Sequence, residues 1–366
     1  MKPLRSQRKF KNILTLSGLS CLFLLTMIPL TTVKAQSTGQ FKPGGHVFGQ
    51  FFGDYYYKLS GQSNSFSTAQ YTSHQKNFNA VDIRRLYFGY DYNFSPRVSG
   101  KMELANEGNF LSDGNFAVYI KSAQLKINDV IPNGNLILGE TGTPTFATFT
   151  EHIWGYRSLA KTLPDMRKFG GSHDLGIALQ GNFSSEGIFG YELMIGNGRG
   201  SKVENNKYKK IYLELHAKLK DGLLFELYSD YEGNSTNGIN TARTTFKGFA
   251  GYQIPNFTVG LSAITQTRKN AVQNNTVNSN PSGLSVFAHG SLIKNKLNGM
   301  IRYDFYNPDK SSNYNEHFFL AGLDYLPAPH VHLMPNMWVN SYGSKDGVPS
   351  KSADVVARLT FYYNFP

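Results

Sequence analysis

One segment of the chain, residues 141–173, gathers the side chains best suited to act on charged solutes. Charged groups that ring a water-filled passage determine which ions pass it, and a long irregular segment in a compact domain is usually functional. The basic residues and Glu151 are therefore candidate pore-constriction or anion-binding residues, unless they are only solvated charges of a surface loop. The segment holds four basic and two acidic residues: Arg157, Lys161, Arg167, Lys168, Glu151 and Asp165.

The other motifs that could carry chemistry are weak. His330 and His332 would share one strand face, as two metal ligands could, but no Cys or carboxylate stands nearby in the sequence. The run Gly196–Gly200 resembles a phosphate loop, yet a polar Lys- and Asn-rich segment follows where such a loop would open a helix. A Gly-x-Ser-x-Gly nucleophile motif is absent. We expect no catalytic residue, no metal, no cofactor and no enzymatic activity.

The N-terminus has the order of a secretory signal peptide. Residues 1–12 carry five basic and no acidic side chains, and residues 13–30 are predominantly apolar. Val33-Lys34-Ala35 then offers a cleavage site before position 36. A membrane anchor is the alternative, but the apolar run ends early. We expect residues 1–35 to be removed and residues 36–366 to form a single domain.

The composition excludes several classes of protein. The net charge of +12 suggests a nucleic-acid binder, but six of the basic residues lie in the predicted signal segment. The remainder shows no basic cluster of the kind that nucleic-acid binding needs. The only cysteine, Cys21, also lies in that segment, so the exported chain has no disulfide framework. An aromatic fraction of 14% is too high for a disordered chain.

The chain after the signal segment alternates apolar and polar residues with period two, which predicts strands. In residues 210–220, Ile211, Leu213 and Leu215 share one face, while Tyr212 and Glu214 share the other. No stretch of 18 consecutive apolar residues follows the signal segment. Sixteen strands are predicted, and the fourth changes phase near Ser122, which suggests a β-bulge. Their ranges are 47–58, 81–93, 97–107, 116–127, 134–140, 174–183, 188–197, 210–220, 222–232, 245–253, 256–267, 284–294, 297–306, 317–326, 330–340 and 354–365.

Short and long connections alternate strictly between the predicted strands. This alternation and an even strand number are typical of an outer-membrane β-barrel, with short periplasmic turns and long external loops. In hydrocarbon every backbone polar group must be paired, so such a sheet must close on itself. An all-β transmembrane antiparallel barrel in the outer membrane of a Gram-negative bacterium, in contact with its lipid, is therefore the predicted fold and location. A secreted soluble β-sandwich is the alternative.

One face of each strand in such a barrel lines the lumen. Seven basic and nine acidic residues fall on the polar faces of the clearer strands, so we expect a mixed lumen rather than a basic ladder. The residues expected to face the lumen most clearly are Arg85, Lys101, Glu103, Lys210, Glu214, Lys218, Arg302, Asp304 and Arg358.

Several segments resemble bacterial outer-membrane porins of the phosphate-selective porin O and P group. They are the strand Arg84–Tyr90, the stretch Lys101–Glu103, the run Glu151–Ser158 with Lys161-Thr162, and the tyrosine-rich last strand. The resemblance implies a sixteen-stranded channel, usually a homotrimer, whose third external loop folds into the lumen. It also makes Arg157 and Lys161 candidates for contact with anions. One departure is that the chain ends in Pro366 rather than in an aromatic residue.

These observations favour a passive porin for small hydrophilic solutes or ions, constricted by residues 141–173. A preference for anions or phosphate is one possibility, and a general diffusion pore fits the mixed lumen at least as well. The alternative is a non-conducting barrel whose external loops bind a partner, as in an adhesin or receptor. An enzyme at the barrel rim, with His173 as a conceivable base, has no support from spacing.

Overall fold

The structure is a computed structural model that describes residues 41–64, 67–272, 274, 276–309, 314–344 and 350–365. The predicted signal segment, residues 1–35, and the terminal Pro366 lie outside the described residues. The expectations for cleavage before residue 36 and for the end of the chain therefore remain predictions.

Sixteen long strands form the described part of the chain, and each corresponds to one of the sixteen predicted strands. Neighbouring strands pair antiparallel, and three further strands of two or three residues, β10 (Ser235–Thr236), β11 (Ile239–Asn240) and β14 (Val277–Ser279), lie in loops. The long strands are β1 (Gly44–Ser60), β2 (Asn79–Asn93), β3 (Val98–Asn106), β4 (Tyr119–Ile131), β5 (Gly134–Gly142), β6 (His173–Asn182), β7 (Phe189–Gly196), β8 (Lys210–Lys218), β9 (Leu223–Glu232), β12 (Arg243–Ile254), β13 (Phe257–Val272), β15 (Ser282–Ile293), β16 (Leu297–Asn307), β17 (Glu316–Ala328), β18 (Val331–Tyr342) and β19 (Asp354–Phe365).

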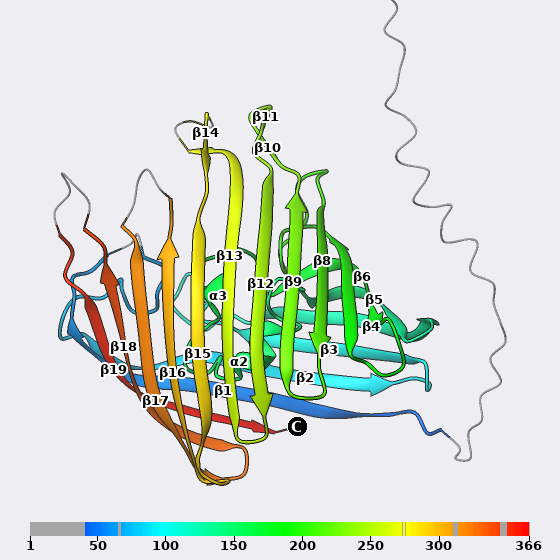
Figure 1. Ribbon diagram of the computed structural model, residues 1–366, viewed down its shortest axis with the longest axis horizontal. Helices are drawn as coiled ribbons and strands as arrows, with labels where there is room; N and C mark the ends of the chain where they lie inside the picture. The colour runs from blue at the N-terminus through cyan, green and yellow to red at the C-terminus, as the bar shows by residue number, and fades with distance from the viewer. Residues whose placement is uncertain are drawn as a thin grey trace, which may run out of the picture. The chain divides into compact units, whose positions relative to one another are not determined.

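The sheet closes on itself because the first strand pairs with the last. β1 is hydrogen-bonded to β2 on one side and to β19 on the other, with Tyr56 opposite Arg358 in the second pair. Figure 1 shows the resulting ring of tilted strands. The predicted closed antiparallel barrel of sixteen strands is thus confirmed.

Side chains of the barrel alternate between an apolar outer face and a polar inner face. In β8, Leu213 is 45% exposed on the outside, whereas Tyr212 and Glu214 are buried inside. Strand geometry turns successive side chains to opposite faces, so the alternation in the sequence becomes an apolar wall around a polar interior. Among the described residues, no helix is long and apolar enough to cross a membrane.

Two β-bulges interrupt the alternation at functionally important places. In the β1–β2 pair, Phe52 faces Arg85 and Gly53 faces Ile83, so Arg84 is an extra residue. In the β3–β4 pair, Lys121 is the extra residue beside Ser122, as the phase change in the sequence suggested. A bulge re-aims side chains locally. As a result the consecutive residues Arg84 and Arg85 are both buried inside the barrel.

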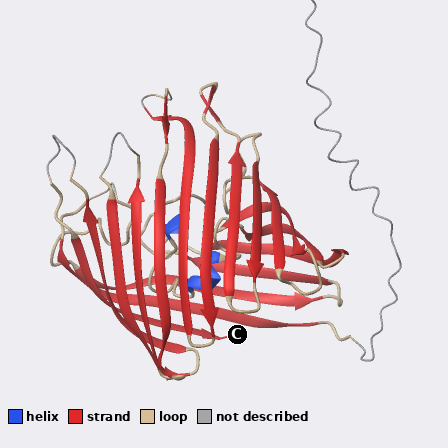
Figure 2. Cartoon of the chain, viewed as in Figure 1, coloured by secondary structure: helices blue, strands red, loops and turns tan. Residues whose placement is uncertain are grey.

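The connections alternate between short turns and long loops, as predicted. We call the two ends of the barrel the short-turn end and the long-loop end. The longest connection, residues 143–172, contains helices α2 (Thr150–Trp154) and α3 (Leu163–Met166), which lie within the ring of strands in Figure 2. We call this segment the inward loop. Its apolar residues, among them Trp154 and Leu163, are almost completely buried in the barrel interior.

Candidate functional site

The inward loop is held in place by cations of the barrel wall. Arg84 of β2 donates a hydrogen bond to the carbonyl of Ser158. Arg358 of β19 donates to the carbonyl of Leu159 at 2.8 Å, and on the far wall Lys247 of β12 donates to the carbonyl of Thr145 at 2.5 Å. These bonds satisfy buried loop carbonyls, whose desolvation would otherwise destabilise an inward conformation.

Each of these wall cations is also paired with a wall carboxylate. Arg358 lies 3.4 Å from Asp54, and Arg302 lies 2.5 Å from Asp304 while donating to the carbonyl of Lys161 at 2.6 Å. Arg302, Asp304 and Arg358 are buried inside the barrel, where Arg302 and Arg358 bond to carbonyls of the inward loop. Their charges act on the loop rather than on a solute in water.

Arg167 does not face open water, contrary to the expectation that it lines the constriction. It is 2% exposed and donates to Glu316 at 2.8 Å and to Asn340 at 3.2 Å. Its Nη1 also lies 3.4 Å from the hydroxyl of Ser67, in the first long loop. The described residues of that loop, 61–64 and 67–78, thus also reach into the barrel, which the sequence analysis did not anticipate.

Two cavities flank the inward loop on the side of β2, β3 and β4. The first, of about 370 Å³, lies toward the long-loop end and is lined by Arg84, Arg85 and Glu107. The second, of about 340 Å³, lies toward the short-turn end, where Asn364 contributes to its wall. Arg157 lines both cavities. Arg157 therefore lies at the boundary between the two cavities.

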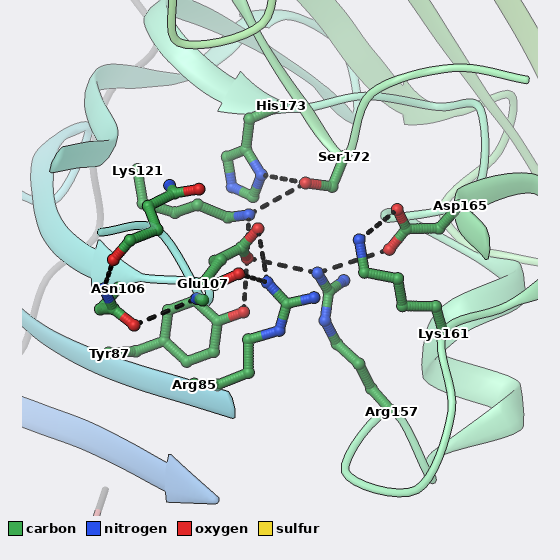
Figure 3. Close-up of polar contacts among 12 residues, drawn as sticks. Arg85, Tyr87, Asn106, Glu107, Lys121, Arg157, Lys161, Asp165, Ser172 and His173 are labelled. Carbon is green, nitrogen blue, oxygen red and sulfur yellow. Dashed lines mark hydrogen bonds and ion pairs between the residues drawn. The ribbon is translucent and has the colours of Figure 1, made fainter. Parts of the chain in front are cut away.

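Four charged residues lie together at this boundary between the cavities, and we call them the eyelet: Arg85, Glu107, Lys121 and Arg157. The carboxylate of Glu107 lies 2.8 Å from Arg85, 2.6 Å from Lys121 and 3.3 Å from Arg157. Tyr87 donates a further hydrogen bond to it at 2.6 Å. Figure 3 shows the three cations converging on this one carboxylate. Burial alone would raise the pKa of Glu107, but the three cations outweigh it and hold the pKa well below its usual value.

The loop side of the eyelet has acidic partners of its own. Arg157 lies 2.5 Å from Glu151 and 3.5 Å from Asp165, and Lys161 lies 3.0 Å from Asp165. Burial raises the pKa of Asp165, but Lys161 and Arg157 outweigh it, so the pKa is lower than usual. Burial is the main cause that lowers the pKa of Lys161. Basic and acidic side chains therefore alternate around Arg157. Most of these charged groups are paired with a group of opposite sign.

The remaining residues expected at the site also lie inside the barrel or at its rim. Lys168 is exposed in the first cavity, and Lys101 lies 3.4 Å from Glu103 beside the second cavity. Lys218 lies over the ring of Phe149 in the inward loop, with 5.3 Å between its ammonium and the ring centre. Two other residues expected to face the lumen, Lys210 and Glu214, are buried. Lys210 pairs with Asp230 at 2.8 Å, and Glu214 pairs with His216 at 2.9 Å.

Sequence reasoning placed Glu107 on the polar face of the predicted strand 97–107 but did not count it among the site residues, and it missed Lys121. Glu107 follows the last residue of β3, and its position depends on the turn that Asn106 fixes by donating to the carbonyls of Asn109 and Ala117 at 2.8 and 2.6 Å. The phase change near Ser122 was the available signal for Lys121, because a bulge there turns an extra side chain inward.

The two weak motifs have structural roles. The backbone N–H groups of Gly198, Arg199 and Gly200 donate to the carboxylate of Asp174 at 2.7, 3.2 and 3.1 Å. The glycine-rich turn is therefore an anion nest that the chain fills with its own carboxylate. His332 pairs with Asp324 at 2.8 Å. Within the described residues, no group of three or more His, Cys, Asp or Glu side chains could hold a metal ion.

Comparison with known proteins supports the fold. No protein-family description and no curated protein match the sequence. The structure is similar to an anion-selective porin from Comamonas acidovorans, at 12% identity and a TM-score of 0.63 over 88% of this chain and 100% of that one. It is similar to the outer membrane channel DcaP of Acinetobacter baumannii, at 14% and 0.68 over 88% and 97%. The trimer form of OmpT, an outer membrane protein of Vibrio cholerae, matches at 13% and 0.56 over 88% and 99%. At these identities the similarity shows a shared fold, that of outer-membrane porin barrels.

Proposed function

We propose that the protein is an outer-membrane porin through which small hydrophilic solutes diffuse passively. The observation that carries this proposal is the pair of cavities that meet at Arg157, between the inward loop and the wall of β2, β3 and β4. An apolar outer wall suits lipid, and a polar interior suits water. Two of the structurally similar proteins are described as an anion-selective porin and an outer membrane channel, which supports the same function.

We propose that the channel prefers anions only weakly. The two cavities are lined by seven basic side chains, which include Arg85, Lys121, Arg157 and Lys161, and by five acidic ones. Most of the cations at the eyelet are paired with carboxylates, so the excess of positive charge is small. Charged side chains around a pore favour the passage of ions of the opposite sign. The resemblance to phosphate-selective porins alone does not favour phosphate over other small anions here.

We propose further that residues 1–35 are removed on export, that residues 36–366 form the barrel, and that the barrel assembles as a homotrimer. The order of basic, apolar and small residues in the first segment supports export. A similar outer membrane protein is described in a trimer form, which supports the assembly. Mass spectrometry of the exported protein tests the cleavage site, and light scattering in detergent tests the trimer.

The test of function is single-channel recording of the purified mature chain in a planar bilayer, with a potassium chloride gradient. We expect stable conductance steps and a reversal potential that shows a small preference for chloride. Folded, heat-modifiable protein that gives no steps would contradict the channel, and would favour a barrel whose external loops bind a partner. A reversal potential that shows preference for potassium would contradict the weak anion preference alone.

A further inference from the structure

Glu107 occupies the point at which an anion entering the eyelet would be held most strongly. Its side chain is 14% exposed and borders the first cavity, so it touches the aqueous passage rather than the barrel core. Three cations lie within 3.3 Å of its oxygens, and a phenol donates to it as well. Guanidinium and ammonium groups are the side chains that bind carboxylates and oxyanions in proteins.

Groups other than the Glu107 carboxylate also hold the cations. Lys121 is the extra residue of the bulge in β4, and Arg85 donates to the backbone carbonyl of Glu107 at 3.4 Å. Arg157 is held from the loop side by Glu151. Lys121 also donates to the hydroxyl of Ser172 at 2.9 Å. The three donors would therefore remain close together if the Glu107 carboxylate were neutral.

From this arrangement we infer that Glu107 is the specificity-determining residue of the channel. Its carboxylate fills an anion-binding site formed by Arg85, Lys121 and Arg157, and so keeps passing anions from being retained there. The inference rests on the proposed function, because specificity refers to solutes that cross the eyelet. The barrel thus carries an oxyanion site that is closed by its own side chain, in the same way that Asp174 fills the nest of residues 198–200.

The test compares the wild-type mature barrel with Glu107→Gln, which keeps the size of the side chain and removes its charge. In a potassium chloride gradient, the chloride-over-potassium permeability ratio should rise about three- to tenfold, the effect of one unit charge on an ion roughly 3–6 Å away in a medium with the dielectric constant of water. Sulfate should reduce the current of the Gln variant at lower concentration than that of wild type. An unchanged permeability ratio in a correctly folded Gln variant would overturn the inference.

Two further variants separate charge from structural damage. Glu107→Asp keeps the carboxylate and should behave like wild type. The double variant Glu107→Gln/Lys121→Met has the same net charge as wild type, so its permeability ratio should return toward the wild-type value. If the double variant kept the raised ratio, loosening of the eyelet rather than lost charge would explain the Gln variant, and the inference would fail.

A binding measurement distinguishes failure of this inference from failure of the proposed function. Calorimetric titration of the detergent-solubilised barrel with sulfate needs no conductance. We expect the Gln variant to bind sulfate at least about tenfold more tightly than wild type, since one repelling charge is removed from a partly buried site. If the Gln variant bound sulfate more tightly and the wild-type protein showed no conductance, the channel function would be refuted. The self-filled anion site would still be supported. Equal binding by both proteins would refute the site whether or not the barrel conducts.

Discussion

Arg358 of the last strand donates a hydrogen bond to the backbone carbonyl of Leu159 in the middle of the inward loop, at 2.8 Å. The same guanidinium lies 3.4 Å from Asp54 of the first strand. The strand pair that closes the barrel therefore also holds the inward loop. The buried ion pair between Arg358 and Asp54 links β19, β1 and the loop.

Replacing Arg358 should loosen the inward loop. In Arg358→Met the carbonyl of Leu159 loses its donor and Asp54 loses one of its two cationic partners, so stability should fall by about 1–3 kcal/mol. The single-channel current should become larger or noisier. Arg97→Met is the matched control, because the guanidinium of Arg97 donates to carbonyls of Asn128 and Asp129 near the short-turn end of β4, away from the inward loop. Equal noise in both variants would show that Arg358 has no special role in the loop.

The outer face of β8 gives a prediction about stability in lipid. Leu213 points outward and is 45% exposed, so Leu213→Arg should destabilise the folded barrel by about 2–4 kcal/mol, measured by urea titration in lipid vesicles. Lys218→Leu should fold normally and shift only ion preference, because Lys218 lies over Phe149 on the inner side. Comparable loss of stability in the two variants would contradict the assignment of faces.

The nest around Asp174 gives a prediction about the loop that follows β7. Three backbone N–H groups and the hydroxyl of Tyr212 donate to this carboxylate, so Asp174→Asn should cost about 1–3 kcal/mol, since a neutral amide accepts fewer bonds. Thermal unfolding in detergent measures the loss. Asp113→Asn, in an exposed loop, serves as the control and should leave the transition unchanged within error. A stable Asp174→Asn variant would show that the nest contributes little.

The eyelet should be insensitive to mild acid. The pKa values of Glu107 and Asp165 lie below their usual range, so both carboxylates stay ionised as the pH falls from 7 to 5. The stability that they contribute is present above the usual carboxyl pKa of about 4, and is lost only as the pH falls through the lowered values.

Reversal potentials at pH 7, 6 and 5 test this prediction. The measurements use the His173→Gln variant, which lacks the imidazole beside Ser172. The change of reversal potential with pH then comes mainly from the carboxyl groups. We expect the same reversal potential at all three values. A shift toward anions at pH 5 as large as that of Glu107→Gln would mean that Glu107 gains a proton in this range.

The sequence alone determined the strands and the way they close. Period-two alternation, as in Ile211–Leu215, turns apolar side chains to one face, and alternating connection lengths indicate a barrel with a short-turn end. The bulge beside Ser122 was also visible as a change of phase. These features are local, because they depend only on which residues stand next to one another.

Tertiary structure alone decided which charges meet. The sequence does not distinguish Arg167 from Arg157, yet Arg167 is buried against Glu316 and Arg157 lines both cavities. Lys121 lies in β4 and Glu107 follows β3, and their 2.6 Å contact depends on a bulge and a turn that aim both inward. Ion pairs between residues that are distant in the sequence depend on how the backbone folds in space. The alternation of apolar and polar residues describes each strand separately, so it does not predict which side chains of different segments meet.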